Sequence, residues 1–222
     1  MMLKGLAGNP TAGYVAPFLV FVGVMALEHA FPPNPELWYP VRFAATLAAI
    51  VFLSWPYLNW RPSKPIASIA IGAAVFVIWV APDRLFHYRQ FWLFHNALTG
   101  VASSAVPLDL RRSAGFLAIR ILGSMALVPV AEELFWRGWM MRWLIDTHFE
   151  KVPLGKYAPM AFWAVAFLFA SEHGPYWEVG LIAGVIYNWW LVRTRNLADC
   201  ILAHAVTNAI LAAWVLTTNE WQ

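Results

Sequence analysis

Three groups of polar residues interrupt the apolar C-terminal half of the sequence, and their residue types could support hydrolytic chemistry. The first group is Glu132-Glu133-x-x-x-Arg137. Residues four apart share a helical face, so Glu133 and Arg137 are expected to pair, whereas Glu132 lies about 100° around the helix. A charged side chain at membrane depth costs roughly 2.5 to 3.5 kcal/mol on insertion scales. The spacing therefore predicts that Arg137 neutralises one glutamate and leaves the other for chemistry.

The second and third groups place two histidines in separate apolar segments. His173 ends the pattern Phe169-x-x-x-His173, directly before a Gly-Pro pair that breaks helices. The third pattern is His204-x-x-x-Asn208, whose spacing puts both side chains on one face of a helix. A free carboxylate, two histidines and an amide spread over three apolar helices are interpreted together as one intramembrane site.

Each group also has a structural interpretation. Arg137 and Arg142 could anchor a helix end by reaching toward the lipid headgroups. His173 could bond a carbonyl freed by the helix break, and His204 with Asn208 could join neighbouring helices. Structural roles are also assigned to the other histidines and to three further polar residues: His29, His87, His95, His148, Glu28, Asn188 and Asp199.

The composition indicates that this polar cluster belongs to a membrane protein. Hydrophobic residues make up 61% of the 222 residues and charged residues only 12%, about half of the ~25% typical of soluble proteins. The net charge is +3, but the basic residues lie in short connections between apolar runs. That distribution argues against a nucleic-acid partner and favours anionic lipid headgroups. Cys200 is the single cysteine, so no intrachain disulfide can form.

The apolar runs predict helices, and no strand-like alternation is present. The expected spans are 13–31, 40–58, 66–81, 113–145, 158–173, 178–192 and 199–217, with 91–106 as a further span or re-entrant element. The fold class predicted is an all-α, polytopic integral membrane protein of about seven to eight transmembrane helices with an intramembrane active site. We expect one integrated domain, with N-terminal helices and the ambiguous segment in 1–112 and the catalytic helical core in 113–222.

Basic residues in the connections between apolar segments indicate how the protein is oriented in the membrane. The segments 59–65 and 193–198 each carry two positive charges, so the positive-inside rule places both, with the N-terminus, in the cytoplasm. Arg111 and Arg112 complicate this assignment because they form another basic pair. No cleavable signal peptide is predicted, since Lys4 is the only charge before the first span.

The three patterns, in this order and this hydrophobic setting, resemble the motifs of the CAAX-protease and bacteriocin-processing (CPBP) family of intramembrane proteases. That family includes the Ras-converting CAAX endopeptidases. The resemblance covers roughly residues 113–217, and all motif positions are filled. The chain also resembles the small CAAX-protease-related proteins associated with exosortase systems. The resemblance implies a glutamic-type endopeptidase in the bacterial inner (cytoplasmic) membrane.

The residues suggest how such an enzyme would work. Glu132 is the expected general base that takes a proton from water, with His173 helping to hold that water. His204 and Asn208 would donate hydrogen bonds to the developing oxyanion, and Glu133 with Arg137 would fix the helix. No cofactor is expected in this version. The alternative is a zinc enzyme in which His173, His204 and Glu132 hold the metal.

A non-enzymatic interpretation uses the same residues. Buried ionisable groups also mark proton or substrate paths in transporters, or the binding site of a membrane scaffold. The absence of an internal repeat favours the protease. The expected partners are the lipid bilayer and a hydrophobic or lipidated peptide or protein substrate. The sequence leaves the particular substrate and the oligomeric state open.

Overall fold

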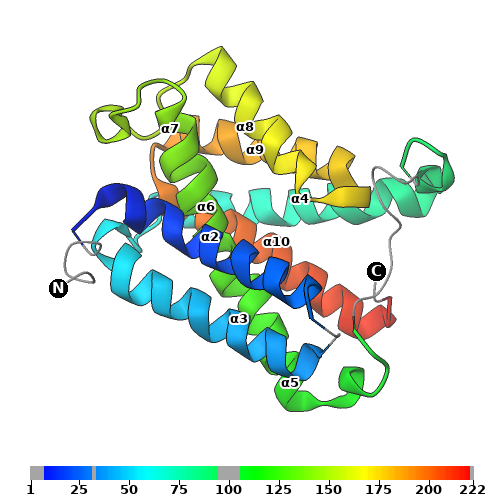
Figure 1. The fold of residues 1–222 in the computed structure, drawn as a ribbon. Coiled ribbons are helices and arrows are strands. Elements are labelled where there is room, and N and C mark those ends of the chain that lie inside the picture. The colour runs from blue at the N-terminus through cyan, green and yellow to red at the C-terminus, as the bar shows by residue number, and fades with distance from the viewer. Residues whose placement is uncertain (1–7, 32–33, 95–105, 221–222) are drawn as a thin grey trace.

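A computed structural model describes residues 8–31, 34–94 and 106–220. All regular structure in these ranges is helical, as the sequence predicted. The helices are α2 (Pro10–His29), α3 (Pro35–Ala49), α4 (Pro65–Phe86), α5 (Ala114–Leu122), α6 (Val128–Glu133), α7 (Met141–Trp143), α8 (Pro159–Ser171), α9 (Trp177–Thr194) and α10 (Leu197–Thr218). In Figure 1, α2 and α3 lie side by side, and α8 and α9 form a second pair.

Helix beginnings follow from local sequence. Proline occupies the first position of α2, α3, α4 and α8, where its missing N–H costs no hydrogen bond. Asparagine caps three helices through its side-chain oxygen, and one example is Asn9, which accepts from Thr11 N at 2.9 Å. These signals explain why the helices begin within a few residues of the predicted positions.

Two helices continue as irregular helical turns. Helix α3 runs on through a π-helical segment (Ile50–Ser54) and a 3-10 turn (Trp55–Tyr57). Helices α5, α6 and α7 are joined by π-helical segments at Gly123–Leu127 and Leu134–Met140 into one long element. Such π-helical turns are often found at functional sites, and here they flank the two glutamates of the first motif.

Five helices in the described residues are long and apolar enough to cross a membrane. They are Pro10–His29, Pro35–Tyr57, Pro65–Phe86, Ala114–Trp143 and Leu197–Thr218. The predicted count of seven to eight is not confirmed. Helix α8 has 13 residues, fewer than the ~20 that span a bilayer. Helix α9 carries charged residues in its first and last turns. Most of the ambiguous segment 91–106 lies outside the described residues.

Helices α8 and α9 are separated by the break that the Gly-Pro pair predicted. A 3-10 turn at Gly174–Tyr176 connects them, and Gly174 adopts a positive φ of 52°. That backbone conformation is accessible to glycine without the steric cost of a side chain. The short turn leaves the two helices packed against each other and holds His173 at the corner between them.

The main apolar core draws residues from both halves of the chain. It includes Phe18 of α2 and Val75 of α4 together with Leu134, Phe169 and Leu191 from the C-terminal half. Burial of such side chains contributes roughly 1.5–3 kcal/mol each when fully removed from water. In lipid, close packing contributes a larger share, because lipid tails are as apolar as the side chains they replace.

Helix α10 is fixed against α4 along its length. A Cβ atom at Gly72 would collide with the backbone oxygen of Ala203, so the two helices touch through backbone. Thr207 Oγ1 donates to Gly72 O at 2.8 Å and also bonds Tyr187 Oη at 2.8 Å. Small residues at such a contact allow transmembrane helices to approach closely. This contact sets the position of His204, which lies one residue beyond Ala203.

Asp199 holds the other end of this contact. Its buried carboxylate accepts from the backbone N–H of Ser63 at 3.1 Å and of Lys64 at 2.8 Å. It also accepts from the hydroxyls of Ser63 at 2.5 Å and Ser68 at 3.0 Å. The residues that lead into α4 are therefore joined to α10, and the carboxylate satisfies the backbone N–H of Lys64 at the N-cap of α4.

The two basic connections lie at the same end of the molecule. Asn196 Nδ2 donates to the backbone oxygen of Arg61 at 2.9 Å, which joins segment 193–198 to segment 59–65. The positive-inside argument placed both segments on one side of the membrane, and this contact is consistent with that arrangement.

Candidate active site

Arg137 is the centre of a buried polar network. Its Nη1 lies 3.1 Å from Glu133 Oε1, which confirms the predicted ion pair. Its Nε donates to Asn188 Oδ1 at 3.0 Å and its Nη2 to Gly184 O at 3.4 Å. Asn188 in turn donates to Phe162 O at 2.8 Å. The planar guanidinium suits such multiple fixed contacts, and it joins the glutamate helix to α8 and α9.

His204 lies between the two glutamates. Its Nδ1 is 2.9 Å from Glu133 Oε1, and its Nε2 is 3.9 Å from Glu132 Oε2. A carboxylate accepts hydrogen bonds, so Nδ1 carries a proton in this arrangement. The ring also stacks on Tyr187, with centroids 5.1 Å apart and planes inclined by 22°. The Nε2 atom is thereby directed toward Glu132.

Glu132 differs from its neighbour because it makes no hydrogen bond to Arg137 or His204, both of which contact Glu133. The residue is 8% exposed, and its Oε2 makes no hydrogen bond within the described part of the chain. The 3.9 Å separation from His204 Nε2 is too long for a direct hydrogen bond. A buried carboxylate with an unused acceptor, facing a histidine, is the group expected for proton transfer.

Phe169 explains why an aromatic residue precedes His173 by four positions. Its carbonyl lies 2.7 Å from His173 Nδ1, and because a carbonyl only accepts, Nδ1 is the protonated nitrogen. Its ring lies 4.2 Å from the centre of the Arg137 guanidinium and 6.1 Å from the His204 ring. Phe169 thus contacts three members of the cluster. Its backbone carbonyl bonds His173, and its ring contacts Arg137 and His204.

Gly180 leaves the space that His173 occupies. A Cβ atom built at Gly180 would lie 3.0 Å from His173 Cγ and 3.1 Å from its Nδ1. Gly184, one turn later, would meet Ala166 O at 3.2 Å in the same way. The small-xxx-small spacing of α9 is therefore a packing feature, and its first glycine also touches the site.

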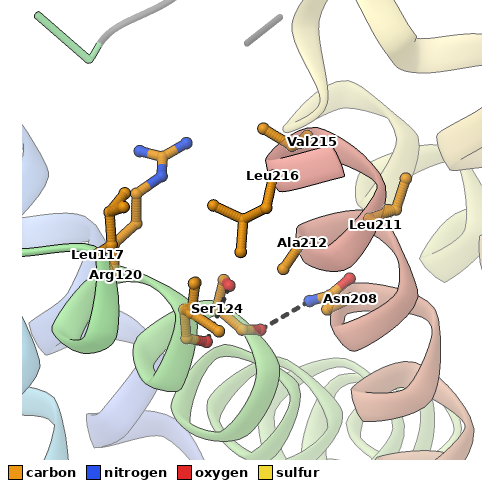
Figure 2. A pocket seen from close by; sticks show the side chains of 9 residues that line it. Leu117, Arg120, Ser124, Asn208, Leu211, Ala212, Val215 and Leu216 are labelled. Atoms are coloured by element: carbon orange, nitrogen blue, oxygen red, sulfur yellow. Dashed lines mark hydrogen bonds between the residues drawn. The ribbon is translucent and has the colours of Figure 1, made fainter. Parts of the chain in front are cut away.

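Asn208 contacts a different element from His204, although both residues lie on the same face of α10. Its Nδ2 donates to Ser124 O at 2.8 Å, in the π-helical segment that precedes α6. The side chain also lines a cavity of about 230 Å³ between α5 and α10 (Figure 2). His204 and Asn208 share a helix face as predicted, but they contact different partners one helical turn apart.

A comparison with known protein families matches the part of the chain that contains all three motifs. Residues 114–210 match the family model described as Rce1-like, type II CAAX prenyl endopeptidase. This segment is Rce1-like. The match confirms the family resemblance drawn from the three motifs, and every motif residue lies inside the matched range. Neither the curated proteins nor the solved structures gave a match.

The family assignment and the helices together give the general class of the protein. It is an integral membrane protein, and its Rce1-like segment implies a CAAX-type endopeptidase. The match leaves residues 8–31 and 34–94 outside it, yet α2 and α4 contribute Phe18 and Val75 to the core that surrounds the Rce1-like segment.

Two contacts of the Rce1-like segment were not anticipated from sequence. Asn188, assigned a structural role without a partner, bonds Arg137 directly. Trp136 Nε1 donates to Glu172 Oε1 at 3.0 Å, so a third glutamate lies beside the motif residues. The signal for Asn188 was available, since a lone amide in an apolar helix needs buried partners. Glu172 adjoins His173 in sequence and carried no separate signal.

Three of the histidines that were assigned structural roles lie away from the polar cluster. His29 and His87 lie at the ends of α2 and α4, and His148 lies in the connection after α7. Glu28 pairs with Arg42 at 3.4 Å. His95 lies outside the described residues. These positions separate His29, His87 and His148 from the polar cluster.

The zinc alternative can be compared with the geometry. Within the described ranges, no three His, Cys, Asp or Glu side chains are grouped so as to hold a metal ion. The Nδ1 atoms of His173 and His204 already donate to Phe169 O and Glu133. A metal would therefore have to bind through the two Nε2 atoms and Glu132.

Proposed function

We propose that the protein is an intramembrane endopeptidase that hydrolyses a peptide bond near the C-terminus of a membrane-associated or prenylated, CaaX-type substrate. The observation that carries the proposal is the placement of Glu132 Oε2, buried, uncommitted and 3.9 Å from His204 Nε2. This pair lies within the Rce1-like segment. The proposed reaction needs no metal, and water is the nucleophile.

Glu132 is the proposed general base. The adjacent glutamates have separate roles in this proposal, because Glu133 pairs with Arg137 and accepts from His204, whereas Glu132 does neither. A water about 2.8 Å from Glu132 Oε2 would donate one hydrogen bond to that oxygen. Glu132 would take one proton of that water as the water oxygen attacks the scissile carbonyl, and would return it to the leaving amine as the C–N bond breaks.

His173 supports the same water in this proposal. Its Nδ1–H is committed to Phe169 O, so in the neutral ring Nε2 is an acceptor. A second acceptor beside a general base orients the attacking oxygen without competing for the substrate carbonyl. Holding the water in one position converts an encounter between two molecules into a reaction within one assembly, which lowers the entropic part of the barrier.

His204 and Asn208 are the proposed oxyanion donors. Glu133 accepts from His204 Nδ1, and a ring that carries a second proton on Nε2 can donate to a developing negative charge. Asn208 uses one amide N–H on Ser124 O, and its amide carries a second. Each well-placed donor is typically worth about 2.7–4 kcal/mol of transition-state stabilisation.

The setting favours a substrate that reaches the site from the membrane. Glu132, Glu133 and Arg137 all lie in the element Ala114–Trp143, which is long enough to cross a bilayer. A lipidated or hydrophobic peptide partitions into the same layer, at about 0.8 kcal/mol per buried CH₂ of a lipid chain. We place the enzyme in the bacterial inner membrane, where such substrates are held close to the active site.

Cleavage by reconstituted protein tests the proposal. Wild type and Glu132→Ala are compared in liposomes with fluorogenic prenylated CaaX peptides, unprenylated versions and hydrophobic C-terminal anchor peptides. Cleavage by wild type alone supports the protease and names its substrate class. Equal cleavage by both proteins contradicts the role of Glu132. Absence of cleavage in every arm favours a transporter or scaffold that uses the same polar cluster.

A further inference from the structure

A cavity of about 230 Å³ opens between α5 and α10, next to the proposed oxyanion donor. Figure 2 shows Leu117 and Arg120 on one side and Leu211 and Leu216 on the other. Asn208 closes the inner end together with Ser124. The walls of the cavity are thus aliphatic. Its outer end carries the charged guanidinium of Arg120, and its inner end carries the neutral amide of Asn208.

Arg120 supplies the charge at the outer end. Its side chain is half-buried, and its Nη1 donates to Tyr39 Oη at 2.5 Å. A guanidinium has five N–H donors in a planar fork, so most of its capacity remains after this contact. Arg42, which also contacts the Tyr39 ring, pairs with Glu28 at 3.4 Å. Among the described residues, no carboxylate forms an ion pair with Arg120.

We infer that this cavity holds the C-terminal end of the substrate peptide, with Arg120 binding its terminal carboxylate. The inference rests on the proposed function and deepens it, because it names the feature of the peptide that is recognised. Aliphatic walls fit apolar side chains, and a guanidinium matches a carboxylate bidentately. Arg120 is thus a specificity-determining residue, separate from the residues proposed for the chemistry.

Helix geometry sets the length of peptide that fits. Arg120 precedes Ser124 by four residues and Glu132 by twelve, which corresponds to axial distances of about 6 and 18 Å. An extended peptide covers about 3.3–3.6 Å per residue. A scissile carbonyl held between the level of Asn208 and that of Glu132 would therefore lie about two to five residues from the carboxylate at Arg120.

The polar inner end of the cavity favours a peptide over a lipid as its occupant. A lipid phosphate would use Arg120 alone and would leave the amide of Asn208 facing acyl chain. A peptide presents a carboxylate to Arg120 and backbone carbonyls to Asn208, which matches both polar ends of the cavity. Lipid binding then becomes an outcome that the experiment can detect.

Binding measured without turnover separates this inference from the proposed activity. The protein carries Glu132→Gln, in phosphatidylcholine nanodiscs, and binds an N-terminally fluorescein-labelled, farnesylated Cys-Val-Ile-Met peptide followed by anisotropy. The peptide is used with a free carboxylate and with a C-terminal amide. We expect the carboxylate form to bind about 10- to 100-fold more tightly, the range for hydrogen bonds to charged groups.

Arg120→Gln in the same background should bring both peptides to the affinity of the amide form, and Arg120→Lys should retain part of the preference. Arg193→Gln removes an exposed arginine of α9 and should leave the preference intact. A preference that survives Arg120→Gln would overturn the inference, as would equal binding of both peptides by the parent protein. A parallel loss of amide-peptide binding in Arg120→Gln would mean a structural role only.

Two further measurements complete the test. Nanodiscs containing phosphatidylglycerol show whether Arg120 binds lipid phosphate; competition by that lipid without any carboxylate preference would overturn the peptide assignment. Wild-type protein that cleaves neither peptide would defeat the proposed endopeptidase while leaving the binding result intact. Where cleavage occurs, mass spectrometry of the released fragment should give a length of about two to five residues.

Discussion

Glu133 Oε1 accepts from His204 Nδ1 at 2.9 Å while it pairs with Arg137 Nη1 at 3.1 Å. One fully buried carboxylate oxygen therefore joins a helix-fixing arginine to a histidine proposed for the chemistry. The neighbouring Glu132 has no such double commitment. Adjacent glutamates should for this reason respond differently to the same substitution, one in stability and the other in turnover.

Glu133→Gln should destabilise the fold. The change leaves the Arg137 guanidinium buried without its counter-charge, a loss that typically costs about 3–5 kcal/mol. Chemical unfolding in detergent, followed by tryptophan fluorescence, measures this loss. Unfolding indistinguishable from that of wild type would show that Asn188 and Gly184 hold Arg137 without the ion pair.

Glu132→Gln should leave stability almost unchanged and remove activity. The amide has the same shape, and Oε2 forms no hydrogen bond within the described residues that the change would break. Loss of a general base typically lowers turnover by 10²–10⁴-fold. Initial rates in liposomes measure the effect, with Glu150→Gln, an exposed glutamate, as the matched control. Wild-type turnover in Glu132→Gln would rule out the general-base role.

Gly180→Ala should reduce turnover without unfolding the protein. The added Cβ would lie 3.0 Å from His173 Cγ, so the imidazole must move by a few tenths of an ångström, for which we expect about a tenfold loss of kcat. Gly23→Ala is the control, because a Cβ there meets nothing within 4 Å. A Gly180→Ala enzyme with unchanged kcat would separate the position of His173 from catalysis.

Asp199→Ala should weaken the junction of α4 and α10. The wild-type carboxylate accepts from Ser63, Lys64 and Ser68, and a hydrogen bond to a charged group typically contributes about 1.5–3 kcal/mol. Thermal unfolding in detergent should begin at a lower temperature, with Asp146→Ala, which changes an exposed aspartate, close to wild type. Equal transitions for the two variants would mean that the cap of α4 contributes little.

Metal removal should leave activity intact. Protein purified without added metal, then treated with EDTA or 1,10-phenanthroline, should cleave at the untreated rate. Elemental analysis of the same sample should give far less than one zinc per chain. Activity that is lost with a stoichiometric zinc and restored by adding it back would support the zinc enzyme over the proposed metal-free mechanism.

Sequence spacing was sufficient for contacts within one helix. Glu133 and Arg137 pair because four residues make about one helical turn. Helix limits followed from Pro and Asn at the N-termini and from the Gly-Pro break between α8 and α9. The number of membrane spans did not follow, because apolar composition alone does not separate a 13-residue helix such as α8 from a complete span.

Contacts between helices depended on the tertiary structure. His204 and Glu133 are 71 positions apart, and their meeting requires the backbone contact of α4 with α10 at Gly72. Asn188 had no sequence signal naming Arg137 as its partner, because a hydrogen bond across helices depends on their rotation and depth.

The sequence by itself determined the helical, membrane-embedded class and the residue types available for chemistry, because periodicity and hydrophobicity are local properties. Only the tertiary structure decided which glutamate is paired across helices. Glu132 and Glu133 are chemically identical neighbours, and they differ because the packing of α10 brings His204 to Glu133, which already pairs with Arg137, and leaves Glu132 3.9 Å from the same histidine.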